Sequence, residues 1–313
     1  MTATLQVTLA PLDVRFARHT LGHLVRRWGP QVEEVLLVVD QKESPFRART
    51  ERSDVQAARA ELDAVVAGLS HPGLRVVEVD RSRAARQRTA ERFGARRLPE
   101  SDFRGRPYYT YLYGLAEARE PYVLHVDSDM MFGGGSATWI AEAVQWFGRD
   151  ETLVACNPLP GPPRPDGVLR GQEGYPYEVV GEKAYKFANL STRVFLADME
   201  RFRARLGSLA GKRIPTLRSV VGSALRGQLN WLTLEERVTL AMQQSGSRRL
   251  DFLGRGAGMW SVHPIDRSPA FYANLGSLIA LLEEGAEPTA EQLGHYDLHD
   301  SMIALAAARS AAA

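Results

Sequence analysis

The chain has 313 residues, 44% of them hydrophobic and 24% charged, and a formal net charge of +2. This length allows one large α/β domain with a sizeable core, and the small net charge gives no reason to expect a nucleic acid as partner. A single cysteine, Cys156, excludes an intramolecular disulfide and a cysteine-based zinc site. The sequence shows neither a signal peptide nor an apolar run of about 18 residues, so we expect a cytoplasmic protein without a membrane-spanning helix.

Strands and helices alternate through the first part of the sequence. Apolar runs predict the strands, and apolar residues at helical spacing predict the helices between them. Asp54 is the expected N-cap of one helix, and the run EVLLVVD is typical of a strand buried on both faces. In chain order we expect strand 5–10, helix 14–28, strand 34–40, helix 54–69, strand 74–80, helix 81–97, helix 107–119 and strand 122–127.

The second part is less regular. Thr233 and Glu236 have the spacing of a capping box at a helix start, whereas 207–231 allows no assignment. We expect helix 138–147, strand 152–156, an irregular loop over 157–167, strand 187–197, a helix from Asp198, helix 232–246, strand 248–253, helix 269–284 and a frayed helical tail over 304–313. The alternation predicts a single α/β domain with a mixed, mostly parallel sheet flanked by helices.

Acidic residues follow several of the predicted strands. Asp40 and Asp80 end two of them, and Asp127, Ser128 and Asp129 end a third. Ligands of such sheets bind beyond the carboxyl ends of the strands. Two carboxylates beside a buried strand need a positive charge, and Mg²⁺ or Mn²⁺ would leave coordination positions for phosphate oxygens. We therefore expect a metal–diphosphate site, with an acid pair that caps its own turn as the alternative.

The segment RPYYTYLYGLAEAREPYVLHVDSD, residues 106–129, resembles the helix, strand and acidic DxD motif of nucleotide-sugar-dependent glycosyltransferases of the GT-A fold. The pattern is similar to family 2 and to bacterial members. The resemblance implies a Rossmann-like GT-A sheet, with 1–135 binding the nucleotide sugar and 136–303 forming the acceptor side. It places Ala10, Pro11, Asp40, Arg106, Asp127, Ser128 and Asp129 on the donor, with a UDP-sugar as the expected donor.

The same resemblance implies roles for residues further along the chain. In inverting members an acid at the start of the helix over 232–246 is the general base. Glu236 fits by motif position and Glu235 is the alternative, although the capping box competes for Glu236. His263 matches a histidine that completes the metal shell with Asp127 and Asp129, and a buried, hydrogen-bonded core histidine is the other interpretation.

Candidate acceptor residues lie in the irregular regions. Tyr175 and Trp231 offer aromatic faces on which a sugar ring stacks, although simple packing also explains them. Arg193 is expected inside strand 187–197, where a guanidinium needs an acidic or phosphate partner.

The sequence thus predicts a metal-dependent glycosyltransferase that moves a sugar from a nucleoside diphosphate to a hydroxyl of a small soluble acceptor, with inversion. A retaining enzyme, a sugar-1-phosphate nucleotidyltransferase and a non-catalytic sugar-nucleotide-binding protein are the alternatives. A nucleotidyltransferase needs a glycine-rich loop after its first strand, and residues 10–21 contain no glycine. A homodimer is left open.

Overall fold

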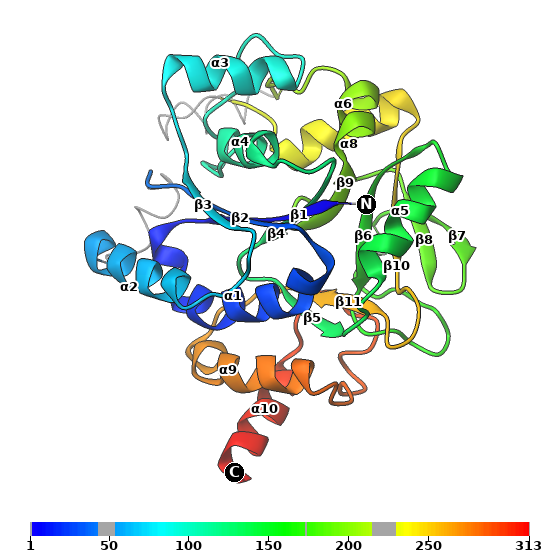
Figure 1. Ribbon diagram of the computed structural model, residues 1–313. Coiled ribbons are helices and arrows are strands. Elements are labelled where there is room, and N and C mark those ends of the chain that lie inside the picture. The colour runs from blue at the N-terminus through cyan, green and yellow to red at the C-terminus, as the bar shows by residue number, and fades with distance from the viewer. Residues whose placement is uncertain (1, 43–53, 173, 215–229, 313) are drawn as a thin grey trace.

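The computed structural model describes residues 2–42, 54–172, 174–214 and 230–312 (Figure 1). Within these ranges one mixed sheet forms the centre of the molecule, with helices above and below it in the view of Figure 1. The strands are β1 (Ala3–Leu9), β2 (Glu34–Val39), β3 (Leu74–Glu78), β4 (Tyr122–Asp127), β5 (Met131–Gly134), β6 (Leu153–Pro160), β7 (Tyr177–Gly181), β8 (Ala184–Phe187), β9 (Val194–Asp198), β10 (Arg248–Phe252) and β11 (Met259–Val262).

Helices connect most of these strands. Two short 3-10 helices, η1 (Pro11–Asp13) and η2 (Gly29–Gln31), flank the first α-helix. The α-helices in the described ranges are α1 (Val14–Trp28), α2 (Val55–Ala67), α3 (Arg83–Arg92), α4 (Tyr109–Glu117), α5 (Trp139–Arg149), α6 (Met199–Leu206), α8 (Leu234–Ser245), α9 (Pro269–Glu283) and α10 (Asp300–Ala312).

The strand order is β3-β2-β1-β4-β9-β6-β10-β8-β7, with β11 pairing with β5 and β6. Strands β3, β2, β1 and β4 run parallel, as do β6 and β10. Strand β9 lies between β4 and β6 and is antiparallel to both, and β8 and β7 continue antiparallel beyond β10. The prediction of a mixed sheet with a parallel core flanked by helices is therefore confirmed.

Both faces of the sheet are buried at β2, as its unbroken apolar run predicts. Val35 and Leu37 belong to the hydrophobic core that contains α1 and α9, whereas Leu36 and Val38 belong to the core that contains α4, α6 and α8. In Figure 1 these two groups of helices lie below and above the sheet. Successive residues of a strand point to opposite faces, so one short strand supplies both cores.

Local signals in the sequence place several elements well. Helix α1 has the predicted bounds, and the Asp54 carboxylate accepts hydrogen bonds from the backbone N–H groups of Gln56 and Ala57 at the start of α2. Helix α8 begins with the predicted capping box and ends at Gly246, which has φ +66° in the left-handed region. Caps depend on neighbours in the chain, and for this reason they can be recognised without knowledge of the fold.

Two assignments in the second part are wrong. The expected loop over 157–167 begins as strand, because Pro158 pairs with β10 while Leu159 and Pro160 pair with β11. The expected strand over 187–197 is two strands, β8 and β9, separated by residues 188–193. These strands lie at different places in the sheet, so the chain has to cross between them, and Thr192 and Arg193 lie in the crossing loop.

The C-terminal residues are helical, as predicted for the tail. Helix α10 covers Asp300–Ala312 and packs on α9. Strand β7 was not anticipated by the sequence. None of the helices in the described part of the chain combines the length and the apolar character that crossing a bilayer requires.

Replacement of Asp198 tests the capping of α6. Its carboxylate accepts hydrogen bonds from the backbone N–H groups of Glu200 and Arg201 at 3.2 and 3.1 Å. We expect Asp198→Ala to lower the free energy of unfolding by about 1 kcal/mol, since an N-cap is lost. Urea denaturation measures the loss, and Asp198→Asn, which keeps an acceptor, is the matched control. Equal losses in the two variants would contradict the capping role.

Candidate functional site

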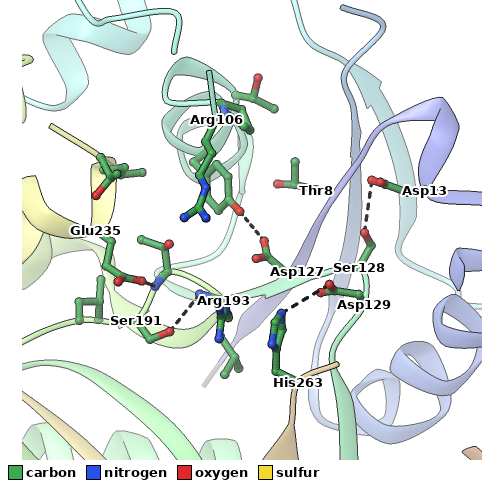
Figure 2. A pocket seen from close by; sticks show the side chains of 18 of the residues that line it. Thr8, Asp13, Arg106, Asp127, Ser128, Asp129, Ser191, Arg193, Glu235 and His263 are labelled. Atoms are coloured by element: carbon green, nitrogen blue, oxygen red, sulfur yellow. Dashed lines mark hydrogen bonds and ion pairs between the residues drawn. The ribbon is translucent and has the colours of Figure 1, made fainter. Parts of the chain in front are cut away.

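A cavity of about 870 Å³ lies at the carboxyl ends of β1, β2 and β4 (Figure 2). Both parts of the chain line it, as expected for an α/β sheet that binds a ligand at this edge. The predicted site residues that line it are Ala10, Pro11, Asp40, Arg106, Asp127, Ser128, Asp129, Tyr175, Arg193, Glu235 and His263.

The acid pair has different surroundings at its two carboxylates. Asp129 is buried, its Oδ2 is paired with the guanidinium of Arg267, and His263 Nε2 lies 3.7 Å from the same oxygen. Burial raises the pKa of Asp129, while Arg267 and His263 act in the opposite direction. Asp127 is more exposed, and its Oδ1 accepts a hydrogen bond from the Tyr111 hydroxyl at 2.6 Å. The positive charge beside the acid pair in this structure is therefore Arg267.

The acidic turn is fastened to the loop after β1. The Thr20 hydroxyl donates to the Ser128 carbonyl at 2.5 Å, and the Ser128 hydroxyl donates to Asp13 at 3.4 Å. Asp13 also accepts a hydrogen bond from the Ala10 N–H at 2.7 Å. The sequence analysis missed Asp13, because its role depends on contact with a turn more than a hundred residues away. These bonds hold the segment after β1, which includes Ala10 and Pro11, against the acid pair.

His263 lies between two carboxylates. Its Nε2 is directed toward Asp129, and its Nδ1 lies 3.6 Å from Asp297 Oδ1. The imidazole stacks on Tyr296, with ring centroids 6.1 Å apart and planes at 9°. The nearby His263 side chain lowers the pKa of Asp297. The sequence analysis did not single out Tyr296 or Asp297.

The donor types fit a hard divalent cation. Two carboxylates and an imidazole suit Mn²⁺ or Mg²⁺, and a carboxylate behind a ligating imidazole is a common second layer of metal sites. Within the described ranges, however, no three His, Cys, Asp or Glu side chains lie close enough together to hold an ion, and Arg267 is paired with Asp129. The donor types fit a cation, and binding one would require Arg267 to leave Asp129 and the three ligands to move closer together.

Asp40 lies at the opposite end of the cavity in an ion pair of its own. Its Oδ2 accepts hydrogen bonds from Thr110 Oγ1 at 2.5 Å and from Arg81 Nη2 at 2.7 Å. Arg81 also pairs with Glu100 at 2.6 Å. Burial acts to lower the pKa of Arg81, but the two carboxylates outweigh it and raise that pKa. This network fixes the carboxylate of Asp40 in one orientation on the cavity wall.

Two arginines face the space in front of the acid pair. Arg106 is exposed, lies before α4 and projects into the cavity in Figure 2, and its guanidinium forms no ion pair with a described residue. Arg193 lies between Glu235 and His263 in the same view. Burial acts to lower the pKa of Arg193, but Tyr296, Asp127 and Glu235 outweigh it and raise that pKa. Both guanidinium groups are therefore cationic at neutral pH.

The two glutamates at the start of α8 differ in position. Glu235 lines the cavity, and its Oε2 accepts a hydrogen bond from the Thr192 N–H at 3.1 Å. Glu236 is exposed and does not line the cavity, because its carboxylate accepts the capping-box bonds from the N–H and hydroxyl of Thr233, both at 2.9 Å. The structure thus places Glu235 on the cavity wall and Glu236, the base that the motif position favours, outside it.

The two aromatic acceptor candidates also differ in position relative to the cavity. Tyr175 lines the cavity and is 48% exposed, so one face is accessible. Trp231 lies outside the cavity and packs beside Arg213, whose guanidinium carbon is 5.5 Å from the ring centroid. The packing alternative therefore describes Trp231.

No protein-family model matches this sequence, and no curated protein matches it either. Among solved structures, it is similar to the mannosyltransferase PcManGT from Pyrobaculum calidifontis in complex with GDP-Man and Mn²⁺, at 13% identity over 99% of this chain and 75% of that one, with a TM-score of 0.41. It is also similar to UDP-glucose pyrophosphorylase from Acinetobacter baumanii, at 12% identity over 94% and 96% of the chains, with a TM-score of 0.44.

A third similar structure is glucosyl-3-phosphoglycerate synthase from Mycobacterium tuberculosis in complex with Mn²⁺, UDP and phosphoglyceric acid, at 12% identity over 92% and 80% of the chains, with a TM-score of 0.38. The three proteins are two transferases and a pyrophosphorylase, and likenesses at this level do not decide between these reactions. The reaction of the present chain has to be inferred from its own residues.

Loss of Arg267 tests the ion pair with Asp129. We expect Arg267→Met to lower the free energy of unfolding by about 2 kcal/mol in the presence of EDTA, because a buried carboxylate loses its partner. Urea denaturation at pH 7.5 measures the change. Arg255→Met is the matched control, since Arg255 is exposed and its side chain forms no ion pair with the described residues. A loss no larger than that of the control would argue against the pair.

Proposed function

We propose that this protein is a glycosyltransferase that moves a sugar from a nucleoside diphosphate to an acceptor hydroxyl. The observation that carries the proposal is the cavity in which the acid pair, His263 and two cationic arginines face one another. Such a set of charges suits a diphosphate leaving group, whose negative charge grows as the bond to the sugar breaks.

The donor would extend from the β1 loop toward the acid pair. Ala10, Pro11 and Asp40 line the end assigned to the nucleoside, for which uridine is our expectation. Arg106 and Arg193 would donate paired hydrogen bonds to the diphosphate, because a guanidinium matches two phosphate oxygens at once. Ser128 fixes the acidic turn through Asp13. The half of the cavity beyond Arg193 is then left for the acceptor.

Asp127, Asp129 and His263 would hold Mn²⁺ or Mg²⁺. When bound, the cation supplies Lewis-acid stabilisation of the leaving diphosphate. Asp297 would keep the proton of His263 on Nδ1, so that Nε2 presents its lone pair toward Asp129. The guanidinium of Arg267 would move from Asp129 toward the diphosphate, another anionic partner for the same charge.

Glu235 is the proposed general base. It stands across the cavity from the acid pair in Figure 2, which suits inversion, since the acceptor oxygen that gives up its proton to this base then attacks the sugar carbon from the side opposite the leaving diphosphate. The bond from the Thr192 N–H to Oε2 fixes the side chain, and Oε1 is left to accept the proton of the acceptor hydroxyl.

The loop after β1 gives less support to a nucleotidyltransferase. A triphosphate needs a loop of free backbone N–H groups. Here the loop is the short helix η1, which begins with Pro11, and the Ala10 N–H already donates to Asp13.

Ligand binding tests the donor assignment. We expect UDP with Mn²⁺ to raise the melting temperature of the wild-type protein, corresponding to about 3 kcal/mol at roughly 100-fold excess over Kd. Thermal-shift assays measure this, with UDP alone, Mn²⁺ alone, and GDP or dTDP in place of UDP. Asp129→Asn should abolish the effect of Mn²⁺. Arg255→Met is the matched control and should keep it, because Arg255 does not line the cavity. A wild type that responds to none of the nucleotides would refute the proposal.

The neighbouring glutamates give a matched test of the base. We expect Glu235→Gln to lower kcat for sugar transfer about 100-fold or more, because a base is lost while an acceptor for the Thr192 N–H is kept. Glu236→Gln should leave kcat close to that of the wild type, since glutamine also serves in a capping box. Steady-state kinetics with saturating donor decides between them. A large loss of kcat in Glu236→Gln but not in Glu235→Gln would instead favour Glu236, the base that the motif position indicates.

A further inference from the structure

A second group of polar side chains lines the same cavity on the sheet, away from the acid pair. Asn157, Arg249, Asp251 and Ser261 are 4%, 3%, 2% and 1% exposed, and all four line the cavity. We call this group the polar floor. It comes from β6, β10 and β11, and the residues used for the donor come from other elements. Buried polar groups on strands are uncommon unless they are hydrogen-bonded, so each of them requires an explanation.

Arg249 and Asp251 form a buried ion pair, which accounts for the burial of both side chains. Arg249 Nε and Nη2 donate to the two carboxylate oxygens of Asp251 at 2.7 and 2.9 Å, and the guanidinium carbon lies 4.3 Å from the ring centroid of Phe187. Burial raises the pKa of Asp251 to about 6, although Arg249 opposes this. At pH 7.5 the pair is therefore ionised and neutral as a whole, and the carboxylate oxygens retain lone pairs for further donors.

Each of the other two side chains has a buried oxygen without a hydrogen-bond partner among the described residues. Asn157 Oδ1 and Ser261 Oγ are buried and accept no hydrogen bond from any described residue. The register of β6 and β10 sets Asn157 opposite Asp251, so the two side chains share one face of the sheet. An unsatisfied buried polar atom costs about 1–3 kcal/mol. Atoms left in this state along a cavity wall are typical of a surface that a polar ligand completes.

We propose that the polar floor binds the acceptor, and that the acceptor is a neutral polyhydroxylated compound, a sugar or a polyol. Its hydroxyl groups would donate hydrogen bonds to Asn157, Asp251 and Ser261. The floor is uncharged overall, and its unpartnered oxygens and the Asp251 carboxylate accept hydrogen bonds from O–H donors, whereas the same carboxylate repels phosphate or carboxylate groups. Tyr175, which lines the cavity with one face accessible, would pack against the ring carbons of a sugar. The inference rests on the proposed function, because the donor is assumed to occupy the other half.

Saturation-transfer NMR on the full chain tests the polar floor directly. The probes are glucose, galactose, glycerol and inositol, each compared with a phosphorylated counterpart, in the presence of UDP and Mg²⁺ and again without them. We expect a neutral probe to bind more tightly than its phosphorylated counterpart. Asn157→Ala and Ser261→Ala should each raise its Kd about tenfold, the effect of one hydrogen bond to a buried group.

Matched controls separate binding from folding. Asn274→Ala and Ser277→Ala change the same residue types on α9, outside the cavity, and should bind the probe as the wild type does. Ser261→Ala should not lower the melting temperature of the free protein, because the hydroxyl it removes has no partner among the described residues. A clear loss of stability in Ser261→Ala would instead indicate a structural role and overturn the inference.

The remaining outcomes are also decisive. Absence of binding by every neutral probe, preference for the phosphorylated probes, or unchanged Kd values in Asn157→Ala and Ser261→Ala would overturn the inference. None of these results would change the thermal-shift response to UDP and Mn²⁺, so the proposed function is tested independently of the polar floor. Suppose that neutral probes bind through the polar floor while no nucleotide changes the melting temperature. This result would support the polar floor as a binding site and refute the proposed glycosyltransferase function.

Discussion

The buried carboxylate of Asp129 is the constraint on which the site depends. A carboxylate removed from water requires a cation or several hydrogen-bond donors, and here it has Arg267 and, farther away, His263. The side chains that surround the acid pair come from segments far apart in the sequence. Folding therefore brings positive charge from the C-terminal part of the chain to a turn that the first half of the sheet provides.

The sheet makes this meeting possible. Parallel strands β1, β2 and β4 bring their carboxyl ends to one edge, so the residues that follow them face a common space. Strand β9 runs antiparallel between β4 and β6, and the loop before it carries Arg193 to the same edge. Strand β6 then continues to Pro160 and pairs with β11, after which the chain reaches His263. The antiparallel strands thus complete a cavity whose other half is built from parallel ones.

Some polar side chains in and near the cavity already have hydrogen-bond partners within the protein, whereas others have atoms still available to a ligand. Glu236 is engaged by the N-terminus of its own helix, and the Oδ2 atom of Asp40 already accepts bonds from Thr110 and Arg81. By contrast, Asn157 and Ser261 retain buried acceptor atoms without partners among the described residues. Whether a polar side chain is available to a ligand therefore depends on its surroundings and not on its residue type alone.

The sequence by itself determined what depends on neighbouring residues. The apolar runs, the N-caps at Asp54 and Thr233 and the acids after β4 are local patterns, and each predicts a local structure or a chemical need. The mixed sheet and the helices on both faces followed from them, and the family resemblance added most of the eleven candidate residues that line one cavity. The roles drawn from the family resemblance remain proposals.

Tertiary structure alone decided which groups meet. The split of 187–197 into β8 and β9, the partner Arg267, the contact of His263 with Asp297 and the polar floor all join segments far apart in the chain. It also places Glu235 on the cavity wall and Glu236 outside it, because residues that adjoin in sequence lie about 100° apart around a helix. Such contacts depend on how strands order themselves in the sheet, and no local pattern of residues encodes that order.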